Sequence, residues 1–306
     1  MRVRFGFWIL AAGLAGACSS PGQAPLPDNN TGTGGAAVAG TGGSTGGSPL
    51  ADAASGSGGQ GQIGTGGGGP DGTIKTDGPT PTAPDAGSSE AGAATGSTRV
   101  LIYTLSTGFV HDSTPVAADF ISRSARVAGL QPETSADPKT FTPAGLAVFG
   151  AIILIANAGE PLGPGTTGPD ALIAYVKGGG ALVGIENCTH AYDNYDPYVS
   201  LLGGDFAGHP TGFLTTTCAK EGTHPSVAML PATFNVTDEI YAFTKFRMDN
   251  QVVLRCDTDR RPVSWYREEG AGRVFYTALG HSSASWQMPP LVDQHVIPGL
   301  LWAMRR

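Results

Sequence analysis

Histidines that follow apolar runs are the residues of this chain whose types and spacing could do chemistry. All six histidines lie after residue 110. The largely apolar residues 100–103 lead to Gly108 and His111, and residues 274–279 lead to Gly280 and His281. A hydrophobic strand that runs into a glycine-flanked histidine places an imidazole at the edge of a sheet, where open α/β sheets bind their ligands. Imidazoles at such an edge can move protons or bind metal ions.

Two glutamates add carboxylates to this set. Glu186 comes directly after the apolar run 181–185, and Glu239 lies further along the chain. A carboxylate can replace an imidazole either as a general base or as a metal ligand. We therefore predict Glu239, Glu186, His111 and His281 as catalytic residues.

A divalent metal is the one cofactor that these residue types suggest. Imidazole nitrogens are common metal ligands, and His111, His209 and His281 are the predicted ligand set. The same residues would also suit a metal-free acid–base site. Each has an ordinary structural explanation too: His111 could satisfy backbone groups beside Asp112, and His209 could fix the turn before Pro210.

The elements that position these residues alternate between strand and helix. Continuous apolar runs are typical of parallel strands buried on both faces, and apolar stripes at helical spacing predict the helices between them. The predicted strands are 99–104, 151–156, 181–185, 212–218, 252–256, 262–266 and 273–276. The predicted helices are 115–128, 142–149, 169–177 and 289–304. This order predicts an α/β fold, a flavodoxin-like three-layer sandwich with a mostly parallel sheet and an antiparallel extension.

The N-terminal segment predicts export and lipid anchoring. Arg2 and Arg4 precede an apolar stretch that is too short to span a bilayer permanently, so residues 1–17 are interpreted as a signal peptide. Small residues stand directly before Cys18, as lipoprotein processing requires. We expect lipid on the Cys18 thiol to hold the protein to a membrane of the cell envelope, on its periplasmic or cell-surface side. Ordinary signal-peptide cleavage after Ala17 is the alternative.

Residues 18–97 are expected to form a tether. The stretch after Cys18 is dominated by Gly, Ser, Thr, Ala and Pro, and it contains no aromatic residue. Such a sequence cannot bury enough apolar surface to offset the entropy lost on ordering its backbone. A flexible spacer is therefore predicted between the membrane and residues 98–306, which are enough for one domain.

Charge and cysteine content narrow the function further. The net charge is −7 and no basic cluster occurs, which argues against nucleic acid as a partner. If Cys18 is lipidated, Cys188, Cys218 and Cys256 remain. For an oxidising compartment we expect one disulfide and one buried thiol, with Cys188 and Cys218 as the predicted pair.

Several blocks of the chain together resemble a known family. They are GFVHDS at 108–113, GGGALVGI at 178–185, GDFAGHP at 204–210, TDEIYAF at 237–243 and FYTALGH at 275–281. Their order and spacing resemble the ThuA-like, or trehalose utilisation, family over residues 98–306. The resemblance implies a fold like that of class I glutamine amidotransferases. It also implies a link to carbohydrate metabolism, particularly of oxidised (3-keto) disaccharides and glycosides.

The turn after the strand 181–185 departs from the related proteins. Amidotransferases of this fold carry a cysteine nucleophile there and ThuA-like proteins usually a histidine, whereas this chain has Glu186. A cysteine hydrolase using Cys188 and His190 is a remote alternative. His190 stands where the family more often has aspartate, and we predict it, with His209, as a ligand-binding residue.

The expected function is an exported lyase, hydrolase or isomerase that acts on carbohydrate by acid–base chemistry, with or without metal. Tyr192 and Trp286 could supply the aromatic faces on which sugars stack, although both could equally be core residues. Two-carboxylate glycoside hydrolysis by Glu186 and Glu239 is also conceivable. The alternatives of another class are a tethered sugar-binding module without turnover and an envelope protein whose site has decayed.

Overall fold

The structure is a computed structural model that describes residues 96–257, 259–287 and 289–306. The predicted signal peptide 1–17, the lipidation site Cys18 and nearly all of the tether 18–97 lie outside the described residues. No helix within the described ranges is long and apolar enough to cross a membrane.

A mixed sheet forms the centre of the fold, and within the described residues it has nine strands in the order β2-β1-β3-β4-β11-β10-β9-β6-β7. The first half is parallel. It consists of β2 (Gln131–Ser135), β1 (Arg99–Tyr103), β3 (Ala151–Ile155), β4 (Ala181–Ile185) and β11 (Gly272–Thr277). Every residue of β3 and β4 is buried, because helices cover both faces of this half.

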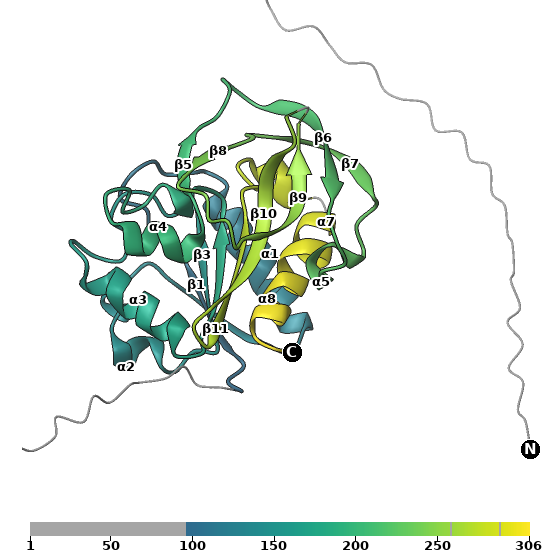
Figure 1. Cartoon of the computed structure of the whole chain (residues 1–306). Helices are drawn as coiled ribbons and strands as arrows, with labels where there is room; N and C mark the ends of the chain where they lie inside the picture. The colour runs from purple at the N-terminus through teal and green to yellow at the C-terminus, as the bar shows by residue number, and fades with distance from the viewer. Residues whose placement is uncertain (1–95, 258, 288) are drawn as a thin grey trace, which may run out of the picture. The chain divides into compact units, whose positions relative to one another are not determined.

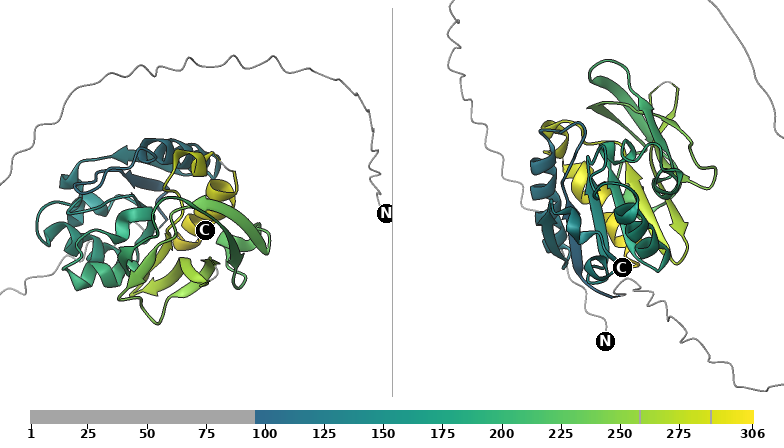
Figure 2. Two further views of the ribbon diagram at one scale, coloured as in Figure 1. Left: turned by 90° about the horizontal axis from the view of Figure 1, so that it is seen from above. Right: turned by 90° about the vertical axis from the view of Figure 1, so that its left-hand side faces the viewer.

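The second half is antiparallel. It consists of β10 (Arg261–Glu269), β9 (Gln251–Cys256), β6 (Leu214–Lys220) and β7 (Thr233–Asp238). Two further strands, β5 (Asp205–Gly208) and β8 (Ala242–Thr244), pair with each other in a separate small sheet. This small sheet and the β6–β7 hairpin extend past one end of the parallel strands (Figures 1 and 2).

Helices form the two outer layers. On one face lie α1 (Thr114–Val127) and α8 (Ile297–Ala303), and on the other lie α3 (Thr167–Lys177) and α4 (Asp196–Leu202) (Figure 1). The shorter helical segments are η1 (Pro138–Thr140), α2 (Pro143–Leu146), η2 (Glu186–Thr189), α5 (Pro225–Ala228), α6 (Ser283–Trp286), α7 (Pro289–Leu291) and the π-helical turn η3 (Val292–Val296). The predicted three-layer sandwich with an antiparallel extension is confirmed.

The predicted Cys188–Cys218 disulfide is wrong. Cys218 on β6 stands directly opposite Cys256 on β9, and these two form the disulfide. Cys188 is a buried free thiol in the turn after β4. Four strand spacings separate β4 from β6, roughly 19 Å, which no disulfide can bridge.

Candidate functional site

The turn after β4 carries the carboxylate around which the site is built. Glu186 is 1% exposed and has a φ of 58°, which is a left-handed conformation that bulky residues rarely adopt. The parallel strand ends at Ile185, and the tight turn η2 starts at Glu186. A strained residue at the carboxyl end of a central strand is a recurrent feature of functional sites.

Three side chains from distant parts of the chain meet Glu186. His111, in the loop after β1, places Nε2 3.2 Å from Glu186 Oε1. His281, in the loop after β11, places Nδ1 3.0 Å from the same oxygen. Tyr241, between β7 and β8, donates its hydroxyl hydrogen to that oxygen as well. The backbone carbonyl of Glu186 accepts a further hydrogen bond from the Tyr276 hydroxyl at 2.7 Å.

A second carboxylate lies on the outer side of this group. Glu239 Oε2 is 2.9 Å from His281 Nδ1 and 3.3 Å from His209 Nε2. His209 Nδ1 lies 2.8 Å from the carbonyl oxygen of Pro210, and because a carbonyl only accepts, this nitrogen carries the proton. Nε2 of His209 therefore donates to Glu239 only when the ring is an imidazolium. The Glu239 side chain is 12% exposed, so solvent reaches it, whereas Glu186 is buried.

Asp238 holds the loop that carries His281. Its carboxylate accepts the backbone N–H groups of Gly280 at 2.9 Å and His281 at 3.1 Å. It also accepts the Ser285 hydroxyl at 3.2 Å. Burial raises the pKa of Asp238 against the lowering effect of these donors. Asp238 was not among the predicted site residues, and its place directly before Glu239 was the only sequence signal for it.

Burial and hydrogen bonds act in opposite directions on Glu186. Burial alone raises the pKa of its carboxyl, but the hydrogen bonds from His111, His281 and Tyr241 outweigh it and lower the pKa to about 2. For His281, burial lowers the pKa, while Glu186 and Glu239 raise it by more, so the net shift is upward. Glu186 is therefore held as a carboxylate, and His281 favours the imidazolium when no metal is bound.

His111, Glu186 and His281 could hold a divalent metal ion. One ligand atom from each lies within 4.8 Å of the others. Two imidazoles and one carboxylate leave coordination positions open for substrate or water, as in catalytic zinc and iron sites. The predicted ligand set of His111, His209 and His281 needs one correction, because His209 faces Glu239 and Glu186 takes its place.

The structure brings most of the predicted residues together. His111, Glu186, His281, Glu239 and His209 form one connected cluster, so the expected convergence is confirmed, and the catalytic roles stay predictions. His190 borders the cluster: its ring lies 5.0 Å from that of Phe206, whose ring is 6.0 Å from His209. Its nearest charged group is Asp193, at 3.4 Å.

Two predicted ligand-binding aromatics do not offer ring faces to a sugar. Tyr192 is buried, and its hydroxyl donates to the Gly163 carbonyl and accepts the Leu162 N–H. Trp286 is 1% exposed, and its indole N–H donates to the Gly280 carbonyl. Both are core residues, so the stacking role predicted for them does not hold.

Other aromatic rings occupy the rim of the cluster. Phe109 and Phe213 are 63% and 51% exposed. Their ring centroids lie 6.5 Å and 5.4 Å from that of His281. Sequence reasoning passed over both, although Phe109 stands two residues before His111. Large apolar rings exposed beside a polar cluster are suited to stacking on a sugar.

Comparisons with known proteins agree with this architecture. The sequence model of the ThuA family, described as trehalose utilisation, matches residues 99–303. The fold is similar to that of a ThuA-like protein from Bacteroides uniformis ATCC 8492, with 20% identity, a TM-score of 0.54 and coverage of 68% of this chain and 89% of that one. It is also similar to a ThuA-like protein from Parabacteroides merdae ATCC 43184, with 15% identity, a TM-score of 0.55 and coverage of 67% and 89%. No curated protein sequence matches.

Proposed function

The chain belongs to the ThuA (trehalose utilisation) family, and from this premise we propose that it is an exported enzyme that removes the proton beside the ketone of a 3-keto sugar. The observation that carries the proposal is the pair of unlike carboxylates around His281. Glu186 Oε1 and Glu239 Oε2 lie 3.0 Å and 2.9 Å from the same nitrogen. One of them is sealed and held ionised, and the other is open to solvent.

Glu239 is the better base of the two. Glu186 accepts hydrogen bonds from three side chains and has a pKa of about 2, so it takes up a proton poorly near neutral pH. A carboxylate of that kind is suited to hold a cation. Glu239 is partly exposed, so a substrate can reach it, and His209 Nε2, 3.3 Å from its Oε2, lies close enough to exchange a proton with it. We therefore assign Glu239 as the base and His111, Glu186 and His281 as the cation ligands.

The reaction follows from the acidity of a carbon next to a ketone. Glu239 takes the proton from that carbon, and the electrons of the broken C–H bond form an enediolate. A divalent cation held by the three ligands would stabilise the negative charge on the enediolate oxygen. The electrons then expel the glycosidic oxygen from the neighbouring carbon, and a proton from Glu239 or His209 goes to that leaving oxygen. Delivery of the proton to the former ketone carbon, without expulsion, moves the ketone to the neighbouring carbon and gives isomerisation instead.

Glycoside hydrolysis by Glu186 and Glu239 fits the geometry less well. In that reaction two carboxylates stand on either side of the scissile bond, with the sugar between them. Here the His281 imidazole lies between the two carboxylates and hydrogen-bonds both. An imidazole therefore occupies the place between the carboxylates that the sugar takes in that reaction.

Attachment to the envelope is part of the same proposal. The apolar segment before Cys18 and the Gly- and Ser-rich stretch after it support a lipid anchor followed by a spacer. The site would then meet its carbohydrate outside the cytoplasm. Labelling of the cells with radioactive palmitate tests this part, and a Cys18→Ser variant should carry no label.

Exchange of the carbon-bound proton with solvent deuterium is the test of the reaction. The full chain is incubated in deuterium oxide with a methyl 3-keto-glucoside, with and without zinc, and the proton beside the ketone is followed by NMR. Its loss, accompanied by release of methanol if elimination follows, is the expected result. Glu239→Gln should slow the exchange by about 10²–10⁴-fold, the usual contribution of a general base. Glu268→Gln, at an exposed glutamate on β10, is the matched control and should exchange like the parent. A Glu239→Gln variant as fast as the parent would remove the base assignment.

A tethered sugar-binding module is the second candidate. Phe109 and Phe213 favour it, because exposed rings at the rim would bind a sugar whether or not chemistry follows. Saturable binding of the 3-keto sugar without any deuterium exchange in the parent protein would decide for the binding module. Exchange above the uncatalysed rate would decide for the enzyme.

A further inference from the structure

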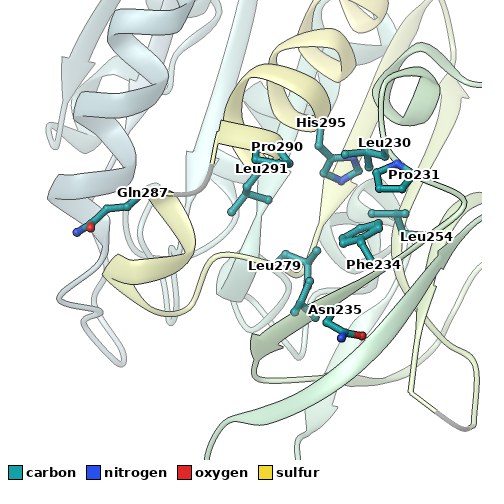
Figure 3. Close-up of a pocket in the computed structure, with 11 residues that line it drawn as sticks. Leu230, Pro231, Phe234, Asn235, Leu254, Leu279, Gln287, Pro290, Leu291 and His295 are labelled. Carbon is teal, nitrogen blue, oxygen red and sulfur yellow. The ribbon is translucent and has the colours of Figure 1, made fainter. Parts of the chain in front are cut away.

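A cavity that contains none of the residues of the His111–Glu186–His281 cluster lies on the side of the sheet covered by the C-terminal helical segments. It has a volume of about 350 Å³. Its walls come from β7, β9, the segment after α5, the loop after β11, α7 and η3, with Leu230, Phe234, Leu254, Leu279 and Leu291 among the lining side chains (Figure 3). Cavities of this size with mostly apolar walls and few polar groups are typical of small-molecule sites.

One buried polar group faces this cavity. His295 is 1% exposed and lines the wall between Leu291 and Leu230 (Figure 3). Its Nδ1 lies 2.9 Å from the carbonyl oxygen of Ser226, so that nitrogen is the donor and carries the hydrogen. Its Nε2 is buried and has no hydrogen-bond partner within the described residues. A buried polar atom without a partner typically costs about 1–3 kcal/mol, so it calls for an explanation.

The backbone around His295 is unusual in the same place. Residues Val292–Val296 form a π-helical turn between α7 and α8. Such turns are rare and are often found at functional sites. Here the turn carries the His295 ring onto the wall of the cavity. The unpartnered Nε2 and the irregular turn are two separate observations that point to a ligand.

We propose that this cavity binds a small, neutral, largely apolar molecule that carries one hydroxyl group, whose hydrogen is donated to His295 Nε2. The apolar walls and the tautomer of His295 together determine the chemical class of the ligand. With the hydrogen on Nδ1, Nε2 offers a lone pair and therefore needs a donor. Burial also lowers the pKa of His295 to about 4, which keeps the ring neutral near pH 7. A sugar does not fit, since its many hydroxyl groups would face leucine and phenylalanine side chains.

The two amide side chains that line the cavity do not alter the expected chemistry of the ligand. Asn235 and Gln287 lie at its edges in Figure 3, away from His295. A long apolar body would lie against Phe234, Leu254 and Leu291, with its hydroxyl end at the histidine. Phenols and alcohols with an alkyl chain have this form.

Paired probes test the proposal on the full chain. Binding of 4-hexylphenol is compared with that of its methyl ether, 4-hexylanisole, by isothermal titration calorimetry. The phenol should bind about tenfold more tightly, the effect of one hydrogen bond to a buried acceptor. Equal affinities for the phenol and the ether would overturn the role of His295, and absence of binding by either at about 1 mM would overturn the site.

Variants locate the binding. His295→Phe should reduce the phenol-to-ether ratio to about one. Because this change also leaves the Ser226 carbonyl without its donor and could impair folding, Leu291→Trp serves as the second variant. It fills the cavity from the α7 side, next to His295, and should abolish binding of both probes with an unchanged circular dichroism spectrum. Parent-like binding by Leu291→Trp would contradict the proposal. Glu239→Gln should bind the phenol like the parent, so the outcome is independent of the reaction proposed above.

Discussion

The parallel and the antiparallel halves of the sheet make different contributions to the same site. The loops after β1, β4 and β11 in the parallel half supply His111, Glu186 and His281, the cluster with the buried carboxylate. The segment after β7, in the antiparallel half, supplies Glu239 and Tyr241, and the loop after β5, in the separate small sheet, supplies His209. The parallel half thus holds the buried charge, and the segments after β5 and β7 place the partly exposed Glu239 and His209 and the buried Tyr241 against it.

This difference reflects how each half is stabilised. The parallel strands are continuous apolar runs between two helical layers, and their carboxyl ends meet at one edge because of their direction. The hairpin β6–β7 is half exposed and is joined to β9 by the Cys218–Cys256 disulfide. Substitutions in the parallel half should therefore report on the buried carboxylate, and substitutions in the antiparallel half on the strands that carry the groups packed against it.

Loss of the buried charge should have the largest effect. Glu186→Gln removes the carboxylate partner of His111 and one of the two carboxylate partners of His281, and breaking a buried ion pair costs about 3–5 kcal/mol. Urea unfolding at about pH 6 should show this decrease in the free energy of unfolding, and zinc should no longer raise the Tm. Glu133→Gln, at an exposed ion pair on β2, should change stability by less than about 1 kcal/mol. A stable Glu186→Gln protein that still responds to zinc would show that the cluster is not built around this carboxylate.

Removal of the disulfide, which lies in the antiparallel half, should have the next largest effect on the free energy of unfolding. The cross-link closes a chain segment with a sequence separation of 38, for which the chain-entropy estimate is about 4 kcal/mol. The double variant Cys218→Ser, Cys256→Ser should be less stable by about 3–4 kcal/mol in chemical unfolding. Cys188→Ala, at the free thiol, tests cysteine loss without a cross-link and should cost less. Equal losses in both proteins would mean that the disulfide does not stabilise the antiparallel half.

Acid should destabilise the face that carries α5 and η3. Burial lowers the pKa of both His224 and His295 to about 4. Each ring therefore takes up a proton on unfolding between about pH 4 and the ordinary value near 6.5, so its contribution is complete above pH 6.5 and is lost as the pH falls toward 4. The loss is at most about 3 kcal/mol for each ring. The stability that Glu186 contributes is complete above about pH 4.5 and is lost only at lower pH, as the pH falls toward about 2.

Urea unfolding at about pH 7 and about pH 4.5 measures this dependence. His224→Phe should retain the stacking on Tyr266 and lose one titrating ring, so its stability should fall less on acidification. A parent protein equally stable at both pH values would contradict the assignment of neutral buried rings.

The parallel half was predictable from the sequence, and the reasons are physical. Strands such as Ala181–Ile185 are buried on both faces, so their apolar character is visible without any partner. Glu186 follows such a strand directly, His111 and His281 lie in the loops after two others, and the parallel direction gathers these strand ends at one edge. One parallel strand, β2, was not predicted. It is polar, contains Pro132 and lies at the edge of the sheet, so no apolar run marks it.

The antiparallel half was predicted less well. The Cys218–Cys256 pairing depends on which strands become neighbours, and β6 lies beside β9 only through a long-range pairing that local sequence does not encode. Tyr241 and Phe213 come to the site for the same reason. Tyr192 and Trp286 show the converse: an aromatic residue near a site motif is as compatible with the core as with the surface.

Anomalous diffraction from crystals of the full chain soaked in zinc tests the central claim most directly. The account predicts one anomalous peak within bonding distance of His111 Nε2, a Glu186 carboxylate oxygen and His281 Nδ1, at about 2.0–2.2 Å from each. Glu239 should stay beside the ion as the accessible carboxylate. A fully soaked crystal in which these side chains keep their mutual hydrogen bonds, with no peak among them, would contradict it.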